Sequence, residues 1–293
     1  MSAATTQKPD HRPISDTAFA AISRLAREEA GLVLSPSKMT MVQSRLRVRL
    51  REVKLPDLDA YARFVCSEAG IAERRLMISA LTTNVSHFYR EAHHFALLRD
   101  QVLPRLIARA RAGGRVRIWS AGCSSGQEPY SIAMDLLSVA PDMTHCDVLI
   151  LASDIDGSIL EAAKSGIYTD TQISGIPAAR RKAFLIEQDA PGAYMIAPPL
   201  RQLVRFRELN LLRDWPMTGR FDVIFCRNVV IYFDGETQAA LWPRFRRALQ
   251  DDGWMFVGHS ERIPDAAQSR FTAVGQTAYR AAPPDVSARP PAM

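Results

Sequence analysis

The chain has 293 residues, of which 47% are hydrophobic and 23% are charged. This composition supports one large folded domain or two smaller ones. No run of about 18 apolar residues is present, which argues against membrane insertion, and residues 1–16 lack the apolar region of a secretory signal. The net charge of +6 fits an acidic partner, although it is also typical of a surface that keeps a protein soluble.

The cysteines indicate a reducing environment. Cys66, Cys123, Cys146 and Cys226 are not paired at metal-site spacing, and four thiols in a chain of this length do not form a disulfide scaffold. We therefore expect a cytoplasmic location. Both ends, 1–15 and 282–293, are rich in Pro, Ser, Ala and Thr without apolar periodicity, which predicts flexible tails.

Residues 16–83 predict an all-helical N-terminal domain. Asp16 is a candidate cap for the first helix. Ser35 and Pro36 then place a capping hydroxyl before a proline, which is typical of a helix start. Two shorter helical patterns follow, around 61–66 and 71–81.

The helix expected after Pro36 is amphipathic and basic. Its apolar residues recur at spacings of three and four and form one stripe, made by Met39, Val42, Leu46, Leu50 and Val53. Basic residues flank this stripe on both sides. They form either a solvated face or a docking surface for an acidic partner. The docking candidates are Lys38, Arg45, Arg49 and Arg51.

After Gly114 the pattern changes to alternating strands and helices. Buried-type strands are expected at 116–119, 148–151, 221–226 and 254–257, and a hairpin at 271–280. Helices are expected from about Gln127, Asp156 and Glu236. This alternation predicts the α/β class, with a doubly wound, mostly parallel sheet that helices cover on both faces.

The alternation breaks over 168–208. A helix at 178–185 and short strands at 194–197 and 204–207 indicate a small β subdomain inserted there. The expected organisation of the chain is then a helical domain over 16–83, a linker helix over 84–114 and an α/β domain over 115–281.

Polar features follow several of these strands, at the edge where open parallel sheets bind ligands. They are a small-residue loop at 120–126, the acid Asp154, the pair Asn210 and Leu211, and the pair Arg227 and Asn228. Small residues let a ligand approach the backbone, and a carboxylate at a strand end can accept both ribose hydroxyls. Together they predict a nucleoside-cofactor site. Singly, the loop is also compatible with a bare turn and Asp154 with a helix cap.

Five sequence motifs together resemble those of a known family. They are TTNVSHFYRE at 82–91, WSAGCSSGQEPYS at 119–131, ASDID at 152–156, FCRNVVIYF at 225–233 and GHSE at 258–261. In this order and spacing the chain, over roughly 16–281, resembles the CheR-type chemotaxis-receptor glutamate methyltransferases. The resemblance implies a class I, Rossmann-like methyltransferase fold with an inserted β subdomain.

The resemblance also implies the cofactor and the site. S-Adenosylmethionine would be the methyl donor, S-adenosylhomocysteine the product, and the γ-carboxylate of receptor glutamates the acceptor. The implied cofactor contacts are Asn84, Ser86, Arg90, Glu128, Asp154, Asn210, Leu211, Arg227 and Asn228. Ser86 stands where the family often has Thr, and Gln127 stands where a second acid is common beside Glu128.

The implied chemistry needs little from the protein beyond alignment. A glutamate with a pKa of about 4.3 is ionised near neutral pH and needs no strong base. Arg90 is the candidate for holding a carboxylate, and Tyr232 for orienting the nucleophile or the methyl group, although Tyr232 also reads as a packed aromatic. His93 and His94 are interpreted as structural, and no metal is expected.

Two other classes of protein remain possible from the residues. One is a non-catalytic nucleotide-sensing module on the same fold. The other is a nucleic-acid methyltransferase, suggested by the charge of +6, but no aromatic-flanked base pocket follows Asn228. We expect chemoreceptor cytoplasmic domains as partners, and no nucleic acid.

Some members of the resembled family bind a peptide at the receptor's C-terminus as an added strand on the β subdomain. In those members the subdomain loop carries closely spaced glycines. The stretch at 188–194 has only Gly192, next to Pro191, and Pro198 and Pro199 follow. Because proline suits a terminated edge, the sequence predicts that this chain does not use such a tether.

Overall fold

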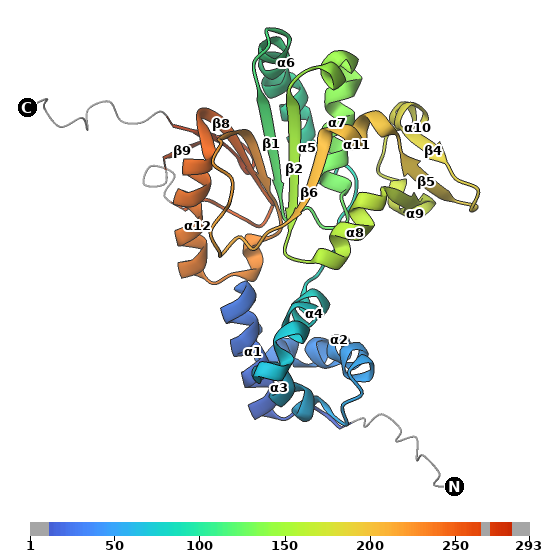
Figure 1. The fold of residues 1–293 in the computed structure, drawn as a ribbon. Coiled ribbons are helices and arrows are strands. Elements are labelled where there is room, and N and C mark those ends of the chain that lie inside the picture. Colours follow the sequence, from blue (N-terminus) through green and yellow to red (C-terminus); the bar gives the residue numbers. More distant parts are fainter. Residues whose placement is uncertain (1–11, 265–269, 283–293) are drawn as a thin grey trace, which may run out of the picture. The chain divides into compact units, whose positions relative to one another are not determined.

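The computed structural model describes residues 12–264 and 270–282 (Figure 1). The chain forms two compact units. Among the described residues, one unit holds 12–83 together with Tyr232–Asp234, and the other holds Asn84–Ile231, 235–264 and 270–282. Among the described residues, the helices are all too short or too polar to span a bilayer.

The first unit consists of helices, as the sequence predicts. They are α1 (Asp16–Ala30), α2 (Met39–Glu52), α3 (Leu58–Cys66) and α4 (Ile71–Leu81), with 3-10 turns at Pro36–Lys38 and Glu68–Gly70. The cap of α1 is Ser15, whose hydroxyl accepts from the Ala18 N–H at 3.2 Å. The expectation that Asp16 caps α1 is therefore wrong by one residue, since Asp16 lies in the first turn.

The ordered part of this unit begins before residue 16. Ile14 is 4% exposed, and the Ser15 N–H donates to Asp59 Oδ1 at 3.0 Å. A flexible tail that extends to residue 15 is therefore wrong at its inner end. The expected tails at 1–11 and 283–293 lie outside the described residues.

Two of the candidate docking residues on α2 hold the first unit together. Arg45 donates to the carbonyls of Leu81 and Thr82 at 2.7 and 2.8 Å. Arg49 donates to both carboxylate oxygens of Glu73 at 2.9 Å, and Glu73 is only 7% exposed. Tertiary contacts thus engage both guanidinium groups, and a docking role of Arg45 and Arg49 stays a prediction.

The other two candidates make fewer contacts. Lys38 donates to the Val33 carbonyl at 3.3 Å, and Arg51 donates to the Arg47 carbonyl at 3.2 Å. Neither contacts a carboxylate in the part of the chain that the structure describes. Lys38 and Arg51 therefore stay predictions for docking.

The second unit is built on a seven-stranded sheet with the order β6-β2-β1-β7-β8-β10-β9. β6, β2, β1, β7 and β8 pair in parallel, and β10 pairs antiparallel with β8 and β9. The strands are β1 (Val116–Ala121), β2 (Val148–Asp154), β6 (Val204–Glu208), β7 (Phe221–Cys226), β8 (Leu249–Val257), β9 (Phe271–Gly275) and β10 (Ala278–Ala281). The strand order reverses between β1 and β7, which is where such sheets bind ligands. The predicted α/β fold class is confirmed.

Both faces of this sheet carry a core. On one face, Ile118 and Val223 join a cluster with buried residues of the helices that precede and follow β1. On the other face, the rings of Trp119 and Phe245 have centroids 5.7 Å apart. The helices are α5 (Ala92–Leu97), α6 (Leu103–Arg111), α7 (Gln127–Val139), α8 (Gly157–Ser165) and α12 (Gly235–Ala248), with 3-10 turns at Pro141–His145 and Val230–Tyr232. Such two-sided cover explains why all six residues of β7 are buried.

The stretch 84–114 is part of the second unit and not a linker. Phe95, Leu98 and Leu106 are buried in the same core cluster as the sheet. A π turn, Leu98–Val102, joins α5 to α6 just ahead of Pro104. Because proline has no N–H and crowds the preceding turn, the wider turn accommodates it within one helical run.

The insertion is a three-stranded antiparallel sheet in the order β3-β5-β4, with short helices around it. Its elements are β3 (Ile167–Thr169), α9 (Asp170–Ile173), α10 (Ala178–Phe184), β4 (Leu185–Glu187), β5 (Ala193–Ile196) and α11 (Pro198–Leu203). The strand expected at 204–207 is β6, which pairs with β2 at the edge of the main sheet. Extending the insertion to residue 208 is therefore wrong, since a two-residue period does not specify which sheet a strand joins.

The Arg49–Glu73 pair yields a stability prediction. Arg49→Ala leaves a buried carboxylate without its cation, which typically costs about 3 kcal/mol. We expect hydrogen exchange of the amides in α2, α3 and α4 to show a loss of that size in opening free energy. Arg51→Ala is the matched control and should change the value by less than about 0.5 kcal/mol. Equal effects of the two variants would refute the structural role of Arg49.

Candidate cofactor site

The loop after β1 folds against the end of β2. The N–H groups of Gly122 and Cys123 both donate to the Ser153 carbonyl, at 2.7 and 2.9 Å. Gly122 has φ +87°, and a Cβ there would lie 2.3 Å from Val229 Cγ2. Glycine is required at this position because the backbone is left-handed and the loop after β7 approaches closely. Three strand-end loops therefore meet at one place.

Asp154 lies at the carboxyl end of β2 with 9% of its surface exposed. Its Oδ2 accepts from the Ser124 N–H at 2.8 Å, and its Oδ1 accepts from the Asp156 N–H at 3.1 Å. Burial raises the pKa of Asp154 above its usual range. These two bonds leave lone pairs for further donors such as ribose hydroxyls. The cap of α8 is Asp156, not Asp154, which removes the helix-cap alternative.

Arg227 lies between two carboxylates at the end of β7. Its guanidinium nitrogens are 3.2 Å from Glu91 Oε2 and 3.1 Å from Glu128 Oε2, and its side chain is 2% exposed. It also donates to the Arg90 carbonyl. Ser120 Oγ donates to the other oxygen of Glu128 at 2.6 Å. One guanidinium therefore holds the segment before α5, the start of α7 and the loop after β7 together.

The two carboxylates respond differently to this pairing. Burial raises the pKa of Glu128 despite the opposing effect of Arg227. Burial also acts to raise the pKa of Glu91, but the Arg227 charge and the hydrogen bonds from His259 lower it to about 2. With both ionised, the triad carries one net negative charge in a buried position. Such a charge favours a cationic ligand.

Glu261 is a site residue that the sequence analysis did not single out. Its carboxylate accepts the N–H groups of Asn228, Val229 and Ile231, at 2.9, 2.9 and 3.3 Å, and that of Gly258 at 2.5 Å. It is 3% exposed, and burial raises its pKa although these hydrogen bonds oppose the rise. Glu261 therefore fixes the backbone that carries Arg227 and Asn228, with Asn228 at φ +59°.

Glu91 and Glu261 both lie inside the quoted motifs. The sequence feature that could have identified these two residues is an acid within a short run of small or polar residues beside a buried strand. Sequence alone does not distinguish an acid that contacts a ligand from one that holds a loop.

The remaining predicted cofactor residues lie in the same unit. Asn84 Nδ2 donates to Asp156 Oδ2 at 2.7 Å, and the Asn84 carbonyl accepts from Ser124 Oγ at 3.0 Å. Asn210 Oδ1 accepts from the Leu212 N–H at 2.9 Å, and the buried Leu211 follows the end of β6. The structure thus brings Asn84 to the loop that carries Ser124. Asp154 accepts a hydrogen bond from the same loop.

Arg90 and Ser86 are the least engaged of these residues. Arg90 donates to the Val85 carbonyl at 3.0 Å, and within the described ranges it contacts no carboxylate. Ser86 is half-buried, and its hydroxyl has no hydrogen-bond partner among residues 12–264 and 270–282. Both side chains therefore have donors to offer a ligand.

Tyr232 is not brought into this unit. It belongs to the first unit, where its carbonyl accepts from the Val33 N–H at 2.9 Å. Its catalytic role stays a prediction.

His93, His94 and Glu91 form a cluster whose potential metal-ligand atoms lie within 4.8 Å of one another. His94 is fully buried, with Nε2 2.9 Å from Thr277 Oγ1. Burial and the Arg227 charge lower the pKa of His94 to about 3, so the ring is neutral near pH 7. Glu91 is already engaged within the protein, since Oε2 pairs with Arg227 and Oε1 pairs with His259.

The donor set fits S-adenosylmethionine. A buried carboxylate at the end of β2 suits the ribose hydroxyls, and Arg90 suits a carboxylate. The negative triad suits a sulfonium. A doubly wound sheet with these groups at its switch point defines an S-adenosylmethionine-dependent methyltransferase.

Comparison with known proteins specifies the family. Residues 84–280 match the family model described as CheR methyltransferase, SAM binding domain, and residues 17–82 match CheR methyltransferase, all-alpha domain. The chain belongs to the CheR methyltransferase family.

Three relatives illustrate the similarity. The probable chemotaxis protein methyltransferase of Rhizobium etli is 46% identical over 86% of this chain and 95% of that protein. The chemotaxis protein methyltransferase of Escherichia coli K12 is 40% identical over 93% of each chain. Chemotaxis protein methyltransferase 2 of Pseudomonas aeruginosa is 42% identical over 85% of this chain and 87% of that protein.

The Glu261 carboxylate yields a prediction about loop positioning. Glu261→Gln turns an amide N–H₂ toward backbone N–H donors, so that at least one buried donor is unpaired, at about 1–3 kcal/mol. We expect affinity for S-adenosylmethionine to fall about tenfold or more in calorimetric titration while the variant stays folded. The exposed Glu236→Gln is the control for lost charge. Unchanged affinity in a folded Glu261→Gln variant would exclude the positioning role.

Proposed function

We propose that this chain transfers the methyl group of S-adenosylmethionine to the γ-carboxylate of glutamates in the cytoplasmic domains of chemoreceptors, acting in the cytoplasm and forming methyl esters. The observation that carries the proposal is the buried Glu91–Arg227–Glu128 triad beside Asp154, in a chain of the CheR methyltransferase family. The names of the relatives support chemotaxis as the setting.

The reaction divides between cofactor and protein. S-Adenosylmethionine supplies an activated methyl group when it is bound. The acceptor glutamate is ionised near neutral pH, so this chain needs no general base. Its own residues align the two reactants and exclude water. Asp154 holds the nucleoside, and Arg90 holds a carboxylate of the cofactor or the substrate through its guanidinium.

The charge of the buried triad has a specific use. A net negative charge in the cofactor site would stabilise the cationic sulfonium of the bound donor. Because Arg227 pairs with both acids, neither carboxylate of the triad competes with the substrate as a nucleophile. The cofactor contacts at Asn84, Ser86, Asn210, Leu211 and Asn228 extend this binding role, and Tyr232 is proposed to orient the acceptor.

The rival classes gain no support from the site. The relatives described above are named as methyltransferases, which favours catalysis over sensing alone, and their names refer to chemotaxis and not to nucleic acid. We propose that neither nucleic acid nor a metal ion takes part.

The proposed function is tested with Asp154. Asp154→Ala should weaken S-adenosylmethionine binding by about 1.5–3 kcal/mol, the scale of hydrogen bonds to a charged group. Wild-type protein should transfer base-labile radiolabel from the cofactor to receptor membranes, and not to DNA or RNA assayed in parallel. Label on nucleic acid, or normal affinity in a folded Asp154→Ala variant, would contradict the proposal.

We further propose that the enzyme meets receptors directly through its helical unit, with Lys38 and Arg51 on the docking surface. Arg45 and Arg49 are placed second in that role, because their guanidinium groups contact Thr82 and Glu73. Exposed charges of this kind act on encounter with an acidic partner more than on binding of the cofactor.

The absence of a C-terminal peptide tether rests on the subdomain loop. The turn between β4 and β5 contains Gly192 at φ +72°, and a Cβ there would lie 2.8 Å from Asp170 Oδ2. Pro198 and Pro199, which the sequence analysis placed in the return after the loop, begin α11. The single glycine and the adjacent Pro191, both in the turn between β4 and β5, support this part of the proposal.

The direct-contact mode predicts two linked results. Lys38→Ala with Arg51→Ala should raise the KM for receptor at low salt, where exposed charges are least screened, and leave cofactor affinity unchanged. Titration with the peptide that tethered relatives recognise should give no micromolar binding. Peptide binding in that range, or an unaltered KM, would overturn the corresponding half of the proposal.

A further inference from the structure

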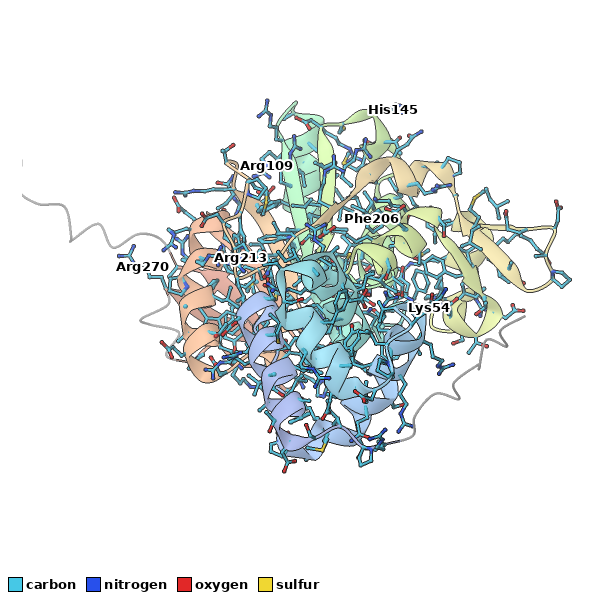
Figure 2. All side chains as sticks on the ribbon, turned by 60° about the horizontal axis from the view of Figure 1, so that its bottom comes forward. Lys54, Arg109, His145, Phe206, Arg213 and Arg270 are labelled. Carbon is cyan, nitrogen blue, oxygen red and sulfur yellow. The ribbon has the colours of Figure 1, made fainter. Side chains whose placement is uncertain are left out.

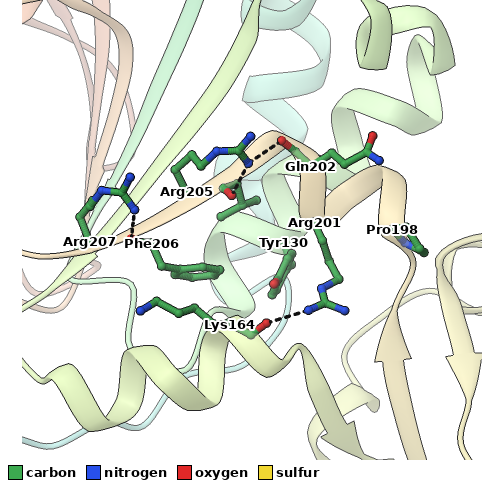
Figure 3. A pocket seen from close by; sticks show the side chains of 9 residues that line it. Tyr130, Lys164, Pro198, Arg201, Gln202, Arg205, Phe206 and Arg207 are labelled. Carbon is green, nitrogen blue, oxygen red and sulfur yellow. Dashed lines mark hydrogen bonds between the residues drawn. The ribbon is translucent and has the colours of Figure 1, made fainter.

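A basic groove lies along the outer edge of β6 in the second unit. Its volume is about 500 Å³. It is formed by the end of α8, one side of α11 and the strand β6, with Tyr130 and Phe206 among its lining (Figure 3). Phe206, which is also labelled in Figure 2, and Tyr130 are both buried.

The lining of this groove is cationic. It includes Lys164, Arg201, Arg205 and Arg207 and no acidic residue. Lys164 pairs with Glu161 at 2.6 Å. The three arginines contact no carboxylate in the described ranges. Like charges gathered in a hollow raise the local potential and attract an anionic partner.

The guanidinium groups are held in place by backbone carbonyls. Arg201 donates to the Lys164 carbonyl at 3.1 Å, and Arg205 donates to the Gln202 and Val204 carbonyls at 2.8 and 3.1 Å. Arg207 donates to the Phe206 carbonyl at 2.8 Å. These carbonyl contacts orient the guanidinium groups, and each group keeps further N–H donors that can bind a carboxylate.

The strand itself is open on this side. β6 stands at the end of the sheet order and pairs only with β2 within the described residues. Figure 3 shows Arg205 and Arg207 on one side of the strand and Lys164 and Arg201 on the other. Side chains two apart on a strand share a face and lie about 7 Å apart, which is the spacing of alternate residues in another extended chain.

We propose that the groove beside β6 binds an acidic, extended protein segment, whose alternating carboxylates pair with Arg205 and Arg207. Such a segment adds along an open strand edge, where main-chain contacts give affinity and cross-strand charge pairs give specificity. This proposal does not depend on the methyl-transfer function.

The positive charge of the groove is also compatible with two different roles. Cationic residues on an edge strand prevent edge-to-edge aggregation, and in that role they need no ligand. A phosphate-rich ligand or an anionic membrane would be attracted by the same charge. A hollow of this shape fits a chain that enters it better than a flat lipid surface.

The experiment measures fluorescence anisotropy of a labelled peptide of alternating glutamate and threonine on the full chain at low salt. We expect saturable binding, and about tenfold weaker binding by Arg205→Gln with Arg207→Gln, because two ion pairs are lost together. The control variant, Arg111→Gln with Arg115→Gln, removes the same charge from arginines that pair with Asp142 and Asp147. This control variant should bind the peptide like the wild type. Addition of S-adenosylmethionine to the wild type should leave its peptide binding unchanged.

Several outcomes would reject the proposal. The first is absence of binding, with the Arg205→Gln, Arg207→Gln variant aggregating faster, which indicates edge protection. The second is equal weakening by the control variant, which indicates general charge attraction. The third is tighter binding of tripolyphosphate or of phosphatidylserine vesicles than of the peptide, which assigns the groove to phosphate or lipid.

Discussion

The buried guanidinium of Arg227 is the constraint on which the cofactor site depends. It contacts Glu91 from the segment before α5 and Glu128 from the first turn of α7, while its own backbone follows β7. A charge with 2% exposure is stable only when it is paired, and each acid in turn is stable only beside Arg227. The three segments therefore have to assemble together, and they bring Asp154 and its loop with them.

A second buried acid makes this arrangement specific. Glu261 accepts four backbone N–H groups and fixes the loop after β7, including the left-handed Asn228. Its bonds involve main chain only, so it shapes the loop without offering a group to a ligand. Arg90 and Ser86, by contrast, keep free donors. The site thus contains acids that hold the loops in place and other side chains whose donors are available to a ligand.

The arginine-rich surface of the protein has more than one use. On α2, Arg49 neutralises a buried acid, so it acts in stability. Beside β6, three arginines contact carbonyls and no described carboxylate, so they are available to a partner. Both groups contribute alike to the net charge of +6, and only the contacts of each guanidinium separate the two roles.

The sequence by itself determined the fold class, the element positions and the family, because apolar periodicity and strand-end motifs are local signals. It placed Asp154 and Arg227 at strand ends, and the sheet order puts those ends on the two sides of β1. Only the tertiary structure decided that β6 belongs to the main sheet, that residues 84–114 join the core, and that Arg45 and Arg49 are engaged. Strand pairing and buried charge pairs join residues that are far apart in the chain, and a local sequence pattern does not specify which distant residue each one contacts.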